Sequence, residues 1–495
     1  MPHHSASAPA AGPTPGHGRG SRAPDVASAA VVLGSEKNLN SDSTPTDSDS
    51  TGESDFKEGG YGWVVVASVF LVNAHTWGLN SSYAVFLAYY LRSGTISGAS
   101  PLAFAFVGGL SISIALLVSP LATLSIGRLG TNATLRLGTV LEAVSFIGAS
   151  FATHTWHLLL SQGVCFGMGL GFCFTATVGV VPQWFTKRRS FANAISTGGS
   201  GFGGLVYSLA TDAMIRNLGL AWSFRILAVI SFVVNGACTL TLRDRNKAVG
   251  AIHIAFHVDL LRRPEFLLYI GWGFFAIISY VIVVFSLADY AHMMGFDPSQ
   301  GSVVAAVFNL SQGLGRPLIG LVSDKVGRIN IAAMGTLISA ITTFFIWTFA
   351  GRFYPGLIIY ALFGMFCGTI WPCVAPVGAE VVGLQLLPSA LSLYWLVLVL
   401  PSTFAEVIGL SLRTSGTNGY INVQVFVGAL YCVSFASIWL LRSWKVQQMD
   451  ALGLTRNNQA ADGQDAQAID GLSERMQQPS LVRSYIDGMF VIKRV

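Results

Sequence analysis

The chain has 495 residues, of which 52% are hydrophobic and only 11% are charged, whereas soluble proteins carry about 25% charged residues. This composition excludes an ordinary soluble domain and predicts a polytopic helical membrane protein. The net charge of +5 comes from basic residues in short loops, with no basic patch of interleaved aromatic residues, so no nucleic-acid partner is expected.

Residues 1–57 are rich in Ser, Pro, Ala and Gly and end in the acidic run SDSTPTDSDSTGESD. Such a segment cannot bury enough apolar surface to fold, so we expect a disordered cytoplasmic tail, with phosphorylation of its Ser and Thr residues as an option. The first basic residues are not followed by a short apolar core and cleavage site, so no signal peptide is predicted.

Twelve apolar runs follow, each near the length that crosses about 30 Å of hydrocarbon. Their predicted bounds are 63–91, 102–124, 137–152, 156–181, 191–210, 222–242, 266–290, 302–322, 331–350, 357–377, 390–410 and 423–441. The runs are continuous rather than alternating, which disfavours a β-barrel. The predicted fold is therefore all-α and membrane-integral. It has six-helix bundles at 58–242 and 265–441, a cytoplasmic central loop at 243–264 and a polar tail at 442–495.

Basic residues in the connecting loops predict the orientation of the chain. On the side of the N-terminus lie twelve of them: Arg128, Arg136, Lys187, Arg188, Arg189, Arg243, Arg245, Lys247, Arg262, Arg263, Lys325 and Arg328. The opposite loops hold four: Arg92, Arg216, Arg352 and Arg413. Both termini are therefore expected in the cytoplasm, with the spans in the plasma membrane or in an internal membrane such as that of the vacuole.

The two halves share an internal repeat at an offset of 197 residues. The matched pairs are Pro120 with Pro317, Leu121 with Leu318, Arg128 with Lys325, Gly130 with Gly327, Gly167 with Gly364, Met168 with Met365, and Gly171 with Gly368. Two separated matches in one register indicate parallel repeats, as in transporters whose duplicated halves surround a central cavity.

The loop after the eighth span, GLVSDKVGR at 320–328, resembles the signature loop of the major facilitator superfamily between helices 8 and 9. Glycine permits close helix approach, the aspartate caps a helix start or pairs with a cation, and the cations stay in the cytoplasm. The corresponding first-half loop has Gly127 where the aspartate is expected. The resemblance assigns a gating or structural role to Asp324, Lys325, Gly327 and Arg328.

A second motif precedes the first span. After Glu58, the run Gly59, Gly60, Tyr61, Gly62 and Trp63 is similar to the D/E-G-G-Y/W-G-W motif of the monocarboxylate porter family. The run QWFTKRR at 183–189 and the glycine-rich run GGSG at 198–201 also resemble that family. The fungal branch fits best, because Asn309, Gly315 and Arg316, followed by Asp324 and Gly327, match its helix-8 pattern.

Arg316 lies inside an apolar span, where a cation at the bilayer centre costs about 2.5 kcal/mol or more. In the resembled family the corresponding arginine binds the substrate carboxylate, which a guanidinium suits with two parallel donors. The alternative is an ion pair or a set of carbonyl contacts between helices. Animal members of that family use an aspartate and a lysine in proton coupling. In this sequence Gln312 stands at the position of the aspartate, and the position of the lysine falls near Ser81. A lactate–proton symporter is therefore not implied.

Other polar and aromatic residues within the spans are weaker candidates. Those for substrate contact are Gln312, Asn309, His75, Asn73, Asn80, Trp371 and Tyr394, and those for proton coupling are His75, Glu142 and Glu406. A lone histidine is also a common packing residue, a carboxylate can pair with Arg225 or face a watery crevice, and aromatic residues within spans commonly pack.

No metal-ligand spacing, phosphate-binding loop or nucleophile–base arrangement is visible, so no metal, no cofactor and no enzyme activity are expected. The six cysteines all lie in apolar runs and are expected as small buried hydrophobes. The favoured function is secondary transport of a small organic anion by alternating access in a lipid bilayer. The alternatives are export of a secondary metabolite, import of a heterocycle such as riboflavin, and a non-transporting nutrient receptor.

Overall fold

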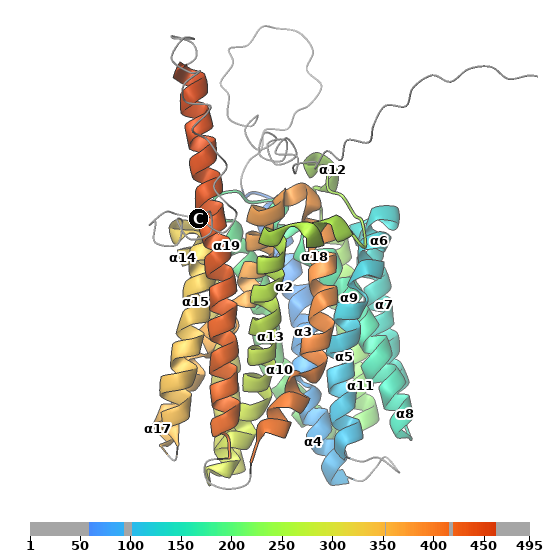
Figure 1. Ribbon diagram of the computed structural model, residues 1–495. Helices are drawn as coiled ribbons and strands as arrows, with labels where there is room; N and C mark the ends of the chain where they lie inside the picture. Colours follow the sequence, from blue (N-terminus) through green and yellow to red (C-terminus); the bar gives the residue numbers. More distant parts are fainter. Residues whose placement is uncertain (1–58, 94–100, 352, 415–418, 462–495) are drawn as a thin grey trace, which may run out of the picture. The chain divides into compact units, whose positions relative to one another are not determined.

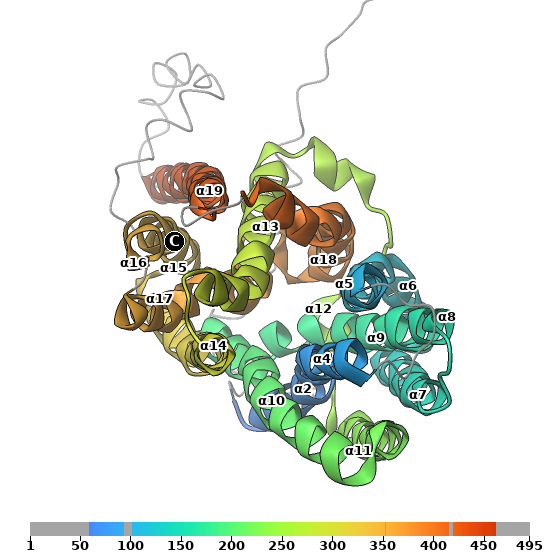
Figure 2. The same cartoon turned by 90° about the horizontal axis from the view of Figure 1, so that it is seen from below.

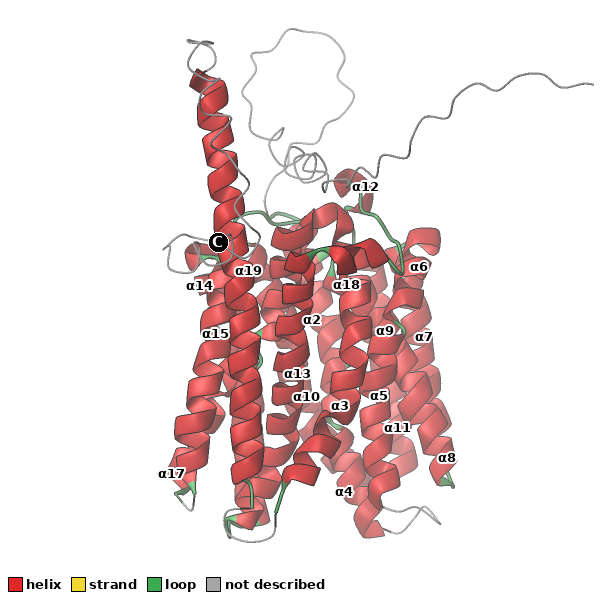
Figure 3. Cartoon of the chain, viewed as in Figure 1, coloured by secondary structure: helices red, strands yellow, loops and turns green. Residues whose placement is uncertain are grey.

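The computed structural model describes residues 59–93, 101–351, 353–414 and 419–461 (Figure 1). These residues belong to one unit of the chain, and they form helices and connecting turns without strands (Figure 3). The predicted N-terminal tail, 1–57, and residues 462–495 of the predicted C-terminal tail lie outside the described residues.

The first half of the chain forms the first six spans. Their helices are α2 (Gly62–His75), α3 (Trp77–Ser81) and α4 (Tyr83–Ser93) in the first span; α5 (Pro101–Leu117) and α6 (Ser119–Leu129) in the second; α7 (Thr131–Ala149) in the third; α8 (Thr155–Leu158), the π-helical Leu159–Cys165 and α9 (Phe166–Val178) in the fourth; α10 (Arg189–Leu218) in the fifth; and α11 (Leu220–Thr241) in the sixth. The helix axis bends by 44° between α5 and α6, where Pro120 follows the break.

The second half follows a connecting segment with α12 (Asn246–Val249) and the 3₁₀ turn Val258–Arg262. Its helices are α13 (Pro264–Met293), α14 (Pro298–Val326), α15 (Arg328–Thr342) with the π-helical Thr343–Trp347 and α16 (Thr348–Ala350), α17 (Tyr354–Cys367), α18 (Ile370–Leu412) and α19 (Ile421–Ala461). Seen along the helices, α2–α11 gather on one side and α13–α19 on the other (Figure 2).

Helix α18 contains parts of two spans. Its 43 residues exceed the roughly 20 needed for one crossing, and Gly383 interrupts it with φ +78° and ψ 164°, outside the helical region. Span ten therefore consists of α17 and α18 up to Gly383, and span eleven is the rest of α18. A positive φ of this kind favours glycine, because a side chain would strain the turn.

Seven of the described helical segments are long and apolar enough to cross a membrane, or eight if the bent pair α5–α6 is one span. One of these segments, 354–412, contains two spans. Helices α7, α10 and α14 have 19, 30 and 29 residues and are less apolar, so they are not among these segments. They carry the polar residues Glu142, Ser200 and Arg316 respectively. With these three helices the twelve predicted spans are confirmed.

Several helices extend beyond the predicted ends of their spans. The helix of the third span begins at Thr131, before the predicted 137, that of the fifth continues to Leu218, past 210, and that of the twelfth continues to Ala461, past 441. The prediction marked only the apolar core of each span, whereas backbone hydrogen bonding continues a helix beyond the hydrocarbon region. Apolar side chains also cover the outer surface, with Leu240 77% and Phe349 76% exposed, as a lipid-facing surface requires.

Helices α10 and α14 pack tightly across the boundary between the halves. A Cβ atom added to Gly201 of α10 would lie 2.8 Å from the Cα atom of Gly313, and one added to Gly320 of α14 would lie 2.5 Å from the Cβ atom of Ala194. Glycine at these positions therefore allows the two backbones to approach. Helices α5 and α18 also meet across the boundary, where the hydroxyls of Ser113 and Thr403 are 2.7 Å apart.

The internal repeat is visible in the backbone. Gly130 follows α6 and Gly327 follows α14, each with a positive φ, +88° and +118°, and a new helix starts directly after each of them. The residues matched at an offset of 197 thus occupy corresponding positions in the two halves. We call the end of the bundle at which α14 ends the Asp324 end.

Candidate functional site

Arg316 of α14 lies at the contact between the two halves. It is 6% exposed, and its Nη1 atom donates to the backbone oxygen of Thr197 and to the Oγ atom of Ser200, both on α10 and both at 2.7 Å. Its Nη2 atom donates to the Oε1 atom of Gln312, one turn earlier on α14, at 3.2 Å. The guanidinium therefore connects α14 of one half with α10 of the other.

All of these acceptors are neutral. Among the residues whose side chains the structure describes, no carboxylate oxygen lies within 4.0 Å of Arg316, and its Nε atom is buried without a partner. Burying a charge without a counter-charge is costly, and charge-assisted hydrogen bonds are about twice as strong as neutral ones. The site can therefore accept an anion, which would replace weaker neutral contacts.

Gln312 connects Arg316 to the seventh span. It is 2% exposed, and its Oε1 atom also accepts a hydrogen bond from the Tyr280 hydroxyl of α13 at 3.0 Å. A Cβ atom added to Gly368 would lie 2.4 Å from the same oxygen, so the break between α17 and α18 lies against this amide. Tyr280, Gln312 and Arg316 thus form one polar network across two spans of the second half, α13 and α14.

An aromatic cluster from both halves lies beside this network. The ring centroid of Trp371, on α18, is 6.0 Å from that of Tyr280 and 5.5 Å from that of Trp77, on α3. Trp395 stacks on Trp371 at 6.0 Å, and Phe174 of α9 lies 5.0 Å from Trp395 and 5.4 Å from Trp77. We call Trp77, Phe174, Trp371 and Trp395 the aromatic quartet.

The predicted asparagine contacts lie elsewhere. Asn73 is buried, and its Nδ2 atom donates to backbone oxygens of α2 and α10, while the Oδ1 atom of Asn80 accepts from the Ser111 hydroxyl at 2.8 Å. These bonds join the first span to the fifth and second spans. Asn309 is exposed. None of the hydrogen bonds described for Arg316 involves these three residues.

His75 and Tyr394 also make contacts away from Arg316. The Nδ1 atom of His75 lies 2.8 Å from the backbone oxygen of Leu71, and its ring meets Tyr207 edge-on at 5.5 Å. Tyr394 is fully buried between α18 and α13, where a Cβ atom added to Gly273 would lie only 1.9 Å from its hydroxyl. Of the predicted substrate contacts, the structure thus brings Arg316, Gln312 and Trp371 together.

Glu142 of α7 is fully buried inside the first half. Its Oε2 atom accepts a hydrogen bond from the Asn235 side chain of α11 at 2.9 Å, whereas Oε1 has no partner among the described residues. Arg225, the other partner considered for a carboxylate, instead lies over the rings of Phe151 and Trp222. The side chain of the third proton-coupling candidate, Glu406, lies outside the described residues.

The charged turn closes the Asp324 end. Both carboxylate oxygens of Asp324 accept backbone N–H groups at the start of α10, from Ser190 at 2.9 Å and from Phe191 at 2.8 Å. Arg328 donates to the carboxylate of Glu380 and, at 2.6 Å, to the backbone oxygen of Thr186. The two halves are therefore tied together here by a helix cap and by a guanidinium, while Lys325 is exposed and Gly327 allows the turn.

The two aromatic motifs of the first half, separate in sequence, are in contact. Trp63 lies edge-on to Phe185 at 5.0 Å, and Tyr61 lies 5.9 Å from Trp184. A Cβ atom added to Gly62 would lie 3.1 Å from both of these partner side chains, so glycine leaves room for them. The turn through Gly59 and Gly60, both with positive φ, places the start of α2 against this segment.

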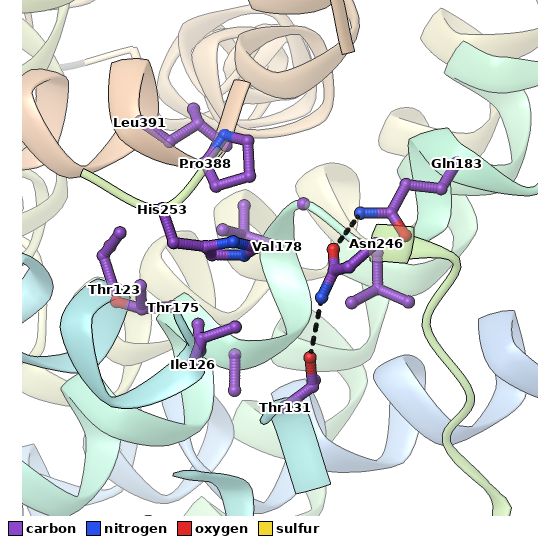
Figure 4. A pocket seen from close by; sticks show the side chains of 13 residues that line it. Thr123, Ile126, Thr131, Thr175, Val178, Gln183, Asn246, His253, Pro388 and Leu391 are labelled. Carbon is purple, nitrogen blue, oxygen red and sulfur yellow. Dashed lines mark hydrogen bonds between the residues drawn. The ribbon is translucent and has the colours of Figure 1, made fainter. Parts of the chain in front are cut away.

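The connecting segment between the halves docks on α18 at the Asp324 end. Its Ile252 amide donates to the backbone oxygen of Gln385 and its Ile254 amide to the Ser389 hydroxyl, both at 2.8 Å. His253 between them faces a small pocket, and burial lowers the pKa of its imidazole (Figure 4). The pocket is also lined by Thr123, Thr131, Thr175, Gln183 and Asn246.

Sequence reasoning missed Tyr280 and the α10 partners of Arg316. Thr197 and Ser200 flank two of the glycines that mark the helix contact, and their spacing of three places them on one helix face, so that pattern was a usable signal. Trp77, Phe174 and Trp395 carried no local signal, because their meeting depends on the packing of three distant helices.

The family model of the Major Facilitator Superfamily matches residues 65–406. This chain belongs to the major facilitator superfamily. It is 32% identical over 394 residues to "Probable transporter MCH2" of Saccharomyces cerevisiae, covering 78% of this chain and 83% of that protein. It is 24% identical over 387 residues to the "Fujikurins efflux protein" of Gibberella fujikuroi, covering 76% and 81%. The fucose:proton symporter FucP of E. coli shares the fold, with a TM-score of 0.61 at 15% identity over 77% of this chain and 98% of FucP.

Membership confirms the predicted major facilitator fold of twelve membrane spans in two bundles. The chain is therefore a multi-pass membrane protein with a transport function for small molecules. The structure adds that its two halves meet at Arg316, at the aromatic quartet and at the Asp324 end.

Proposed function

We propose that this superfamily member is a secondary active transporter of small organic anions and that Arg316 binds the substrate carboxylate. The observation that carries this proposal is a buried guanidinium between the halves whose partners are all neutral and whose Nε atom has no partner among the described residues. A planar fork of donors matches a carboxylate in two parallel hydrogen bonds.

The contacts of Arg316 also supply a coupling to the motion of the halves. In the described arrangement Nη1 is bound to Thr197 and Ser200 across the boundary. A carboxylate competes for these donors, and once it binds, the hydrogen bonds that hold α10 to α14 at this point are exchanged for bonds to the substrate. Binding thereby lowers the free-energy cost of separating the halves, as alternating access around a central site requires.

The Asp324 end is proposed to face the cytoplasm. Arg128 lies in the last turn of α6, Lys187 precedes α10 and Arg243 follows α11, all at this end, and most of the loop cations counted in the sequence lie in the same connections. Residues 58–242 and 265–441 are proposed to move as the two bundles, with 243–264 as the segment that joins them. In this arrangement the cytoplasmic side is closed by Asp324 and Arg328.

Glu142 is the proton-coupling candidate that the contacts support. A fully buried carboxyl with one amide donor and no neighbouring cation among the described residues is more stable as the neutral acid. His75, which is hydrogen-bonded to its own helix, and Glu406 stay predictions. If Glu142 carries the coupled proton, Glu142→Gln preserves the packing and abolishes the dependence of uptake on a pH gradient.

The test is uptake into liposomes that contain the full-length protein, with labelled lactate and a panel of larger acids, with and without a pH gradient. Arg316→Gln should lower uptake by about 30-fold or more, since losing one partner of a buried charged pair costs about 2–5 kcal/mol. Arg225→Gln is the matched control, because Arg225 lies over aromatic rings in the first half, and uptake should be unchanged. Carboxylate uptake that survives Arg316→Gln contradicts the site, and a panel without any transported member favours the receptor.

Export of a secondary metabolite is the second candidate function. It is favoured by the similarity to the "Fujikurins efflux protein" over 76% of this chain. Inside-out and right-side-out vesicles distinguish the two directions, because an exporter driven by a proton gradient accumulates its substrate on the side opposite the Asp324 end. If the substrate equilibrates equally in both kinds of vesicle and a proton gradient has no effect, neither active import nor active export is supported.

A further inference from the structure

The aromatic quartet spans the boundary between the halves. Trp77 and Phe174 belong to the first half, Trp371 and Trp395 to the second, and each ring contacts two others at centroid distances of 5.0–6.0 Å. A motion that separates the halves therefore also separates Trp77 from Trp371 and Phe174 from Trp395. The aromatic surfaces become available when the transporter changes its conformation.

The three indoles of the quartet have unused hydrogen-bond donors. The Nε1 atoms of Trp77, Trp371 and Trp395 are buried, and none has a partner among the described residues. Elsewhere the buried Trp272 donates to Thr336 at 3.0 Å, as buried indoles usually do, whereas the Nε1 atom of the buried Trp347 has no partner among the described residues either. Among the described residues none of the three donors of the quartet is in a hydrogen bond, and the Tyr280 hydroxyl is an oxygen beside the indole of Trp371.

The quartet continues into the Arg316 network without a gap. Trp371 lies against Tyr280, the Tyr280 hydroxyl donates to Gln312, and Gln312 accepts from Arg316. Among the described residues, a cation whose Nε donor has no partner thus lies at one end of this row, and aromatic faces whose N–H groups have no partner lie at the other. This pattern is complementary to a ligand with a carboxylate on one side and a flat, oxygen-bearing ring on the other.

We propose that the substrate class of this transporter is planar aromatic carboxylates that carry an oxygen acceptor on the ring, bound between the quartet and Arg316. The inference rests on the proposed carboxylate contact of Arg316. A short aliphatic acid reaches the guanidinium but leaves the indole donors and faces unused. A saturated ring fills similar volume but has no π face for offset or edge-to-face contact. A ring hydroxyl or carbonyl gives the indole N–H groups an acceptor.

The experiment measures ligand binding to the full-length protein in lipid nanodiscs by calorimetry. Four probes isolate the features in turn: propanoate, cyclohexanecarboxylate, benzoate and 4-hydroxybenzoate. Benzoate should bind about tenfold more tightly than cyclohexanecarboxylate, which corresponds to about 1.4 kcal/mol. 4-Hydroxybenzoate should bind more tightly still.

Variants assign the preference to the quartet. In Trp371→Leu, benzoate and cyclohexanecarboxylate should bind with about equal affinity. In Trp371→Phe, benzoate should still bind more tightly than cyclohexanecarboxylate, but 4-hydroxybenzoate should bind no more tightly than benzoate. Trp347→Leu is the matched control, because Trp347 is also a buried indole whose Nε1 atom has no partner in the described part of the chain, but it stacks on Tyr360 outside the quartet. If Trp371→Leu does not fold, Trp77→Leu from the other half replaces it.

The outcomes separate this inference from the proposed function. Equal binding of benzoate and cyclohexanecarboxylate, with both lost in Arg316→Gln, overturns the aromatic class and leaves the carboxylate site intact. A preference that Trp347→Leu lowers as much as Trp371→Leu also overturns it. Binding of all four acids that survives Arg316→Gln instead refutes the proposed function itself.

Discussion

Removing the Asp324 carboxylate should shift this transporter toward opening at the Asp324 end. Its two oxygens accept the amides of Ser190 and Phe191 at 2.9 and 2.8 Å, and the side chain is 7% exposed. Loss of a helix cap costs about 0.5–2 kcal/mol, and buried bonds to a charged acceptor lie at the upper end. Because the capped helix and Asp324 belong to different halves, the cost falls on the closed state. A loss of about 2 kcal/mol corresponds to about a 30-fold shift toward the open state.

The assay is the labelling rate of a cysteine placed at Ser323, which is 1% exposed and whose hydroxyl lies 3.2 Å from that of Ser190. Labelling of Ser323→Cys by a hydrophilic maleimide requires the halves to part, so Asp324→Ala should accelerate it by about 30-fold. The parent chain gives the background from its six natural cysteines.

Asp297→Ala is the control for this assay, because Asp297 caps α14 from within the same half. It should leave the labelling rate unchanged. An unchanged rate in Asp324→Ala, or an equal acceleration in Asp297→Ala, would refute the reasoning that the cap holds the halves together.

Two further predictions concern packing and pH. Gly201→Ala should lower the free energy of unfolding by about 1–3 kcal/mol in thermal denaturation, because its Cβ atom would lie 2.8 Å from α14. Gly198→Ala, whose nearest α14 atom is at 3.4 Å, should cost clearly less, and equal costs would contradict close backbone packing. Burial lowers the pKa of His253 from 6.5, so its contribution to docking of the connecting segment is present above pH 6.5 and is lost as the pH falls below it. Proteolysis of this segment should therefore accelerate from pH 7.5 to 5.5, and not in His253→Gln.

Local sequence patterns were enough to predict the membrane-spanning fold. Span number follows from apolar length, because about 30 Å of hydrocarbon sets a minimum run of apolar residues whatever the helix contacts. The turns at Gly130 and Gly327 follow from a backbone conformation that favours glycine. Arg316 could also be recognised from the sequence, because a cation inside an apolar span is costly and therefore rare. These features depend on local chemistry, and a local pattern is sufficient to predict them.

The surroundings of Arg316 follow from the packing of helices that are distant in the sequence. Its α10 acceptors lie 116 and 119 positions away along the chain, and no local pattern specifies which helix an apolar span will face. The same holds for Trp77 and Trp371, which come from different halves and meet only after the bundles assemble. Sequence could therefore identify a buried charge that needs a partner. Only the packing of helices showed that its described partners are neutral and that unused aromatic donors lie beside it.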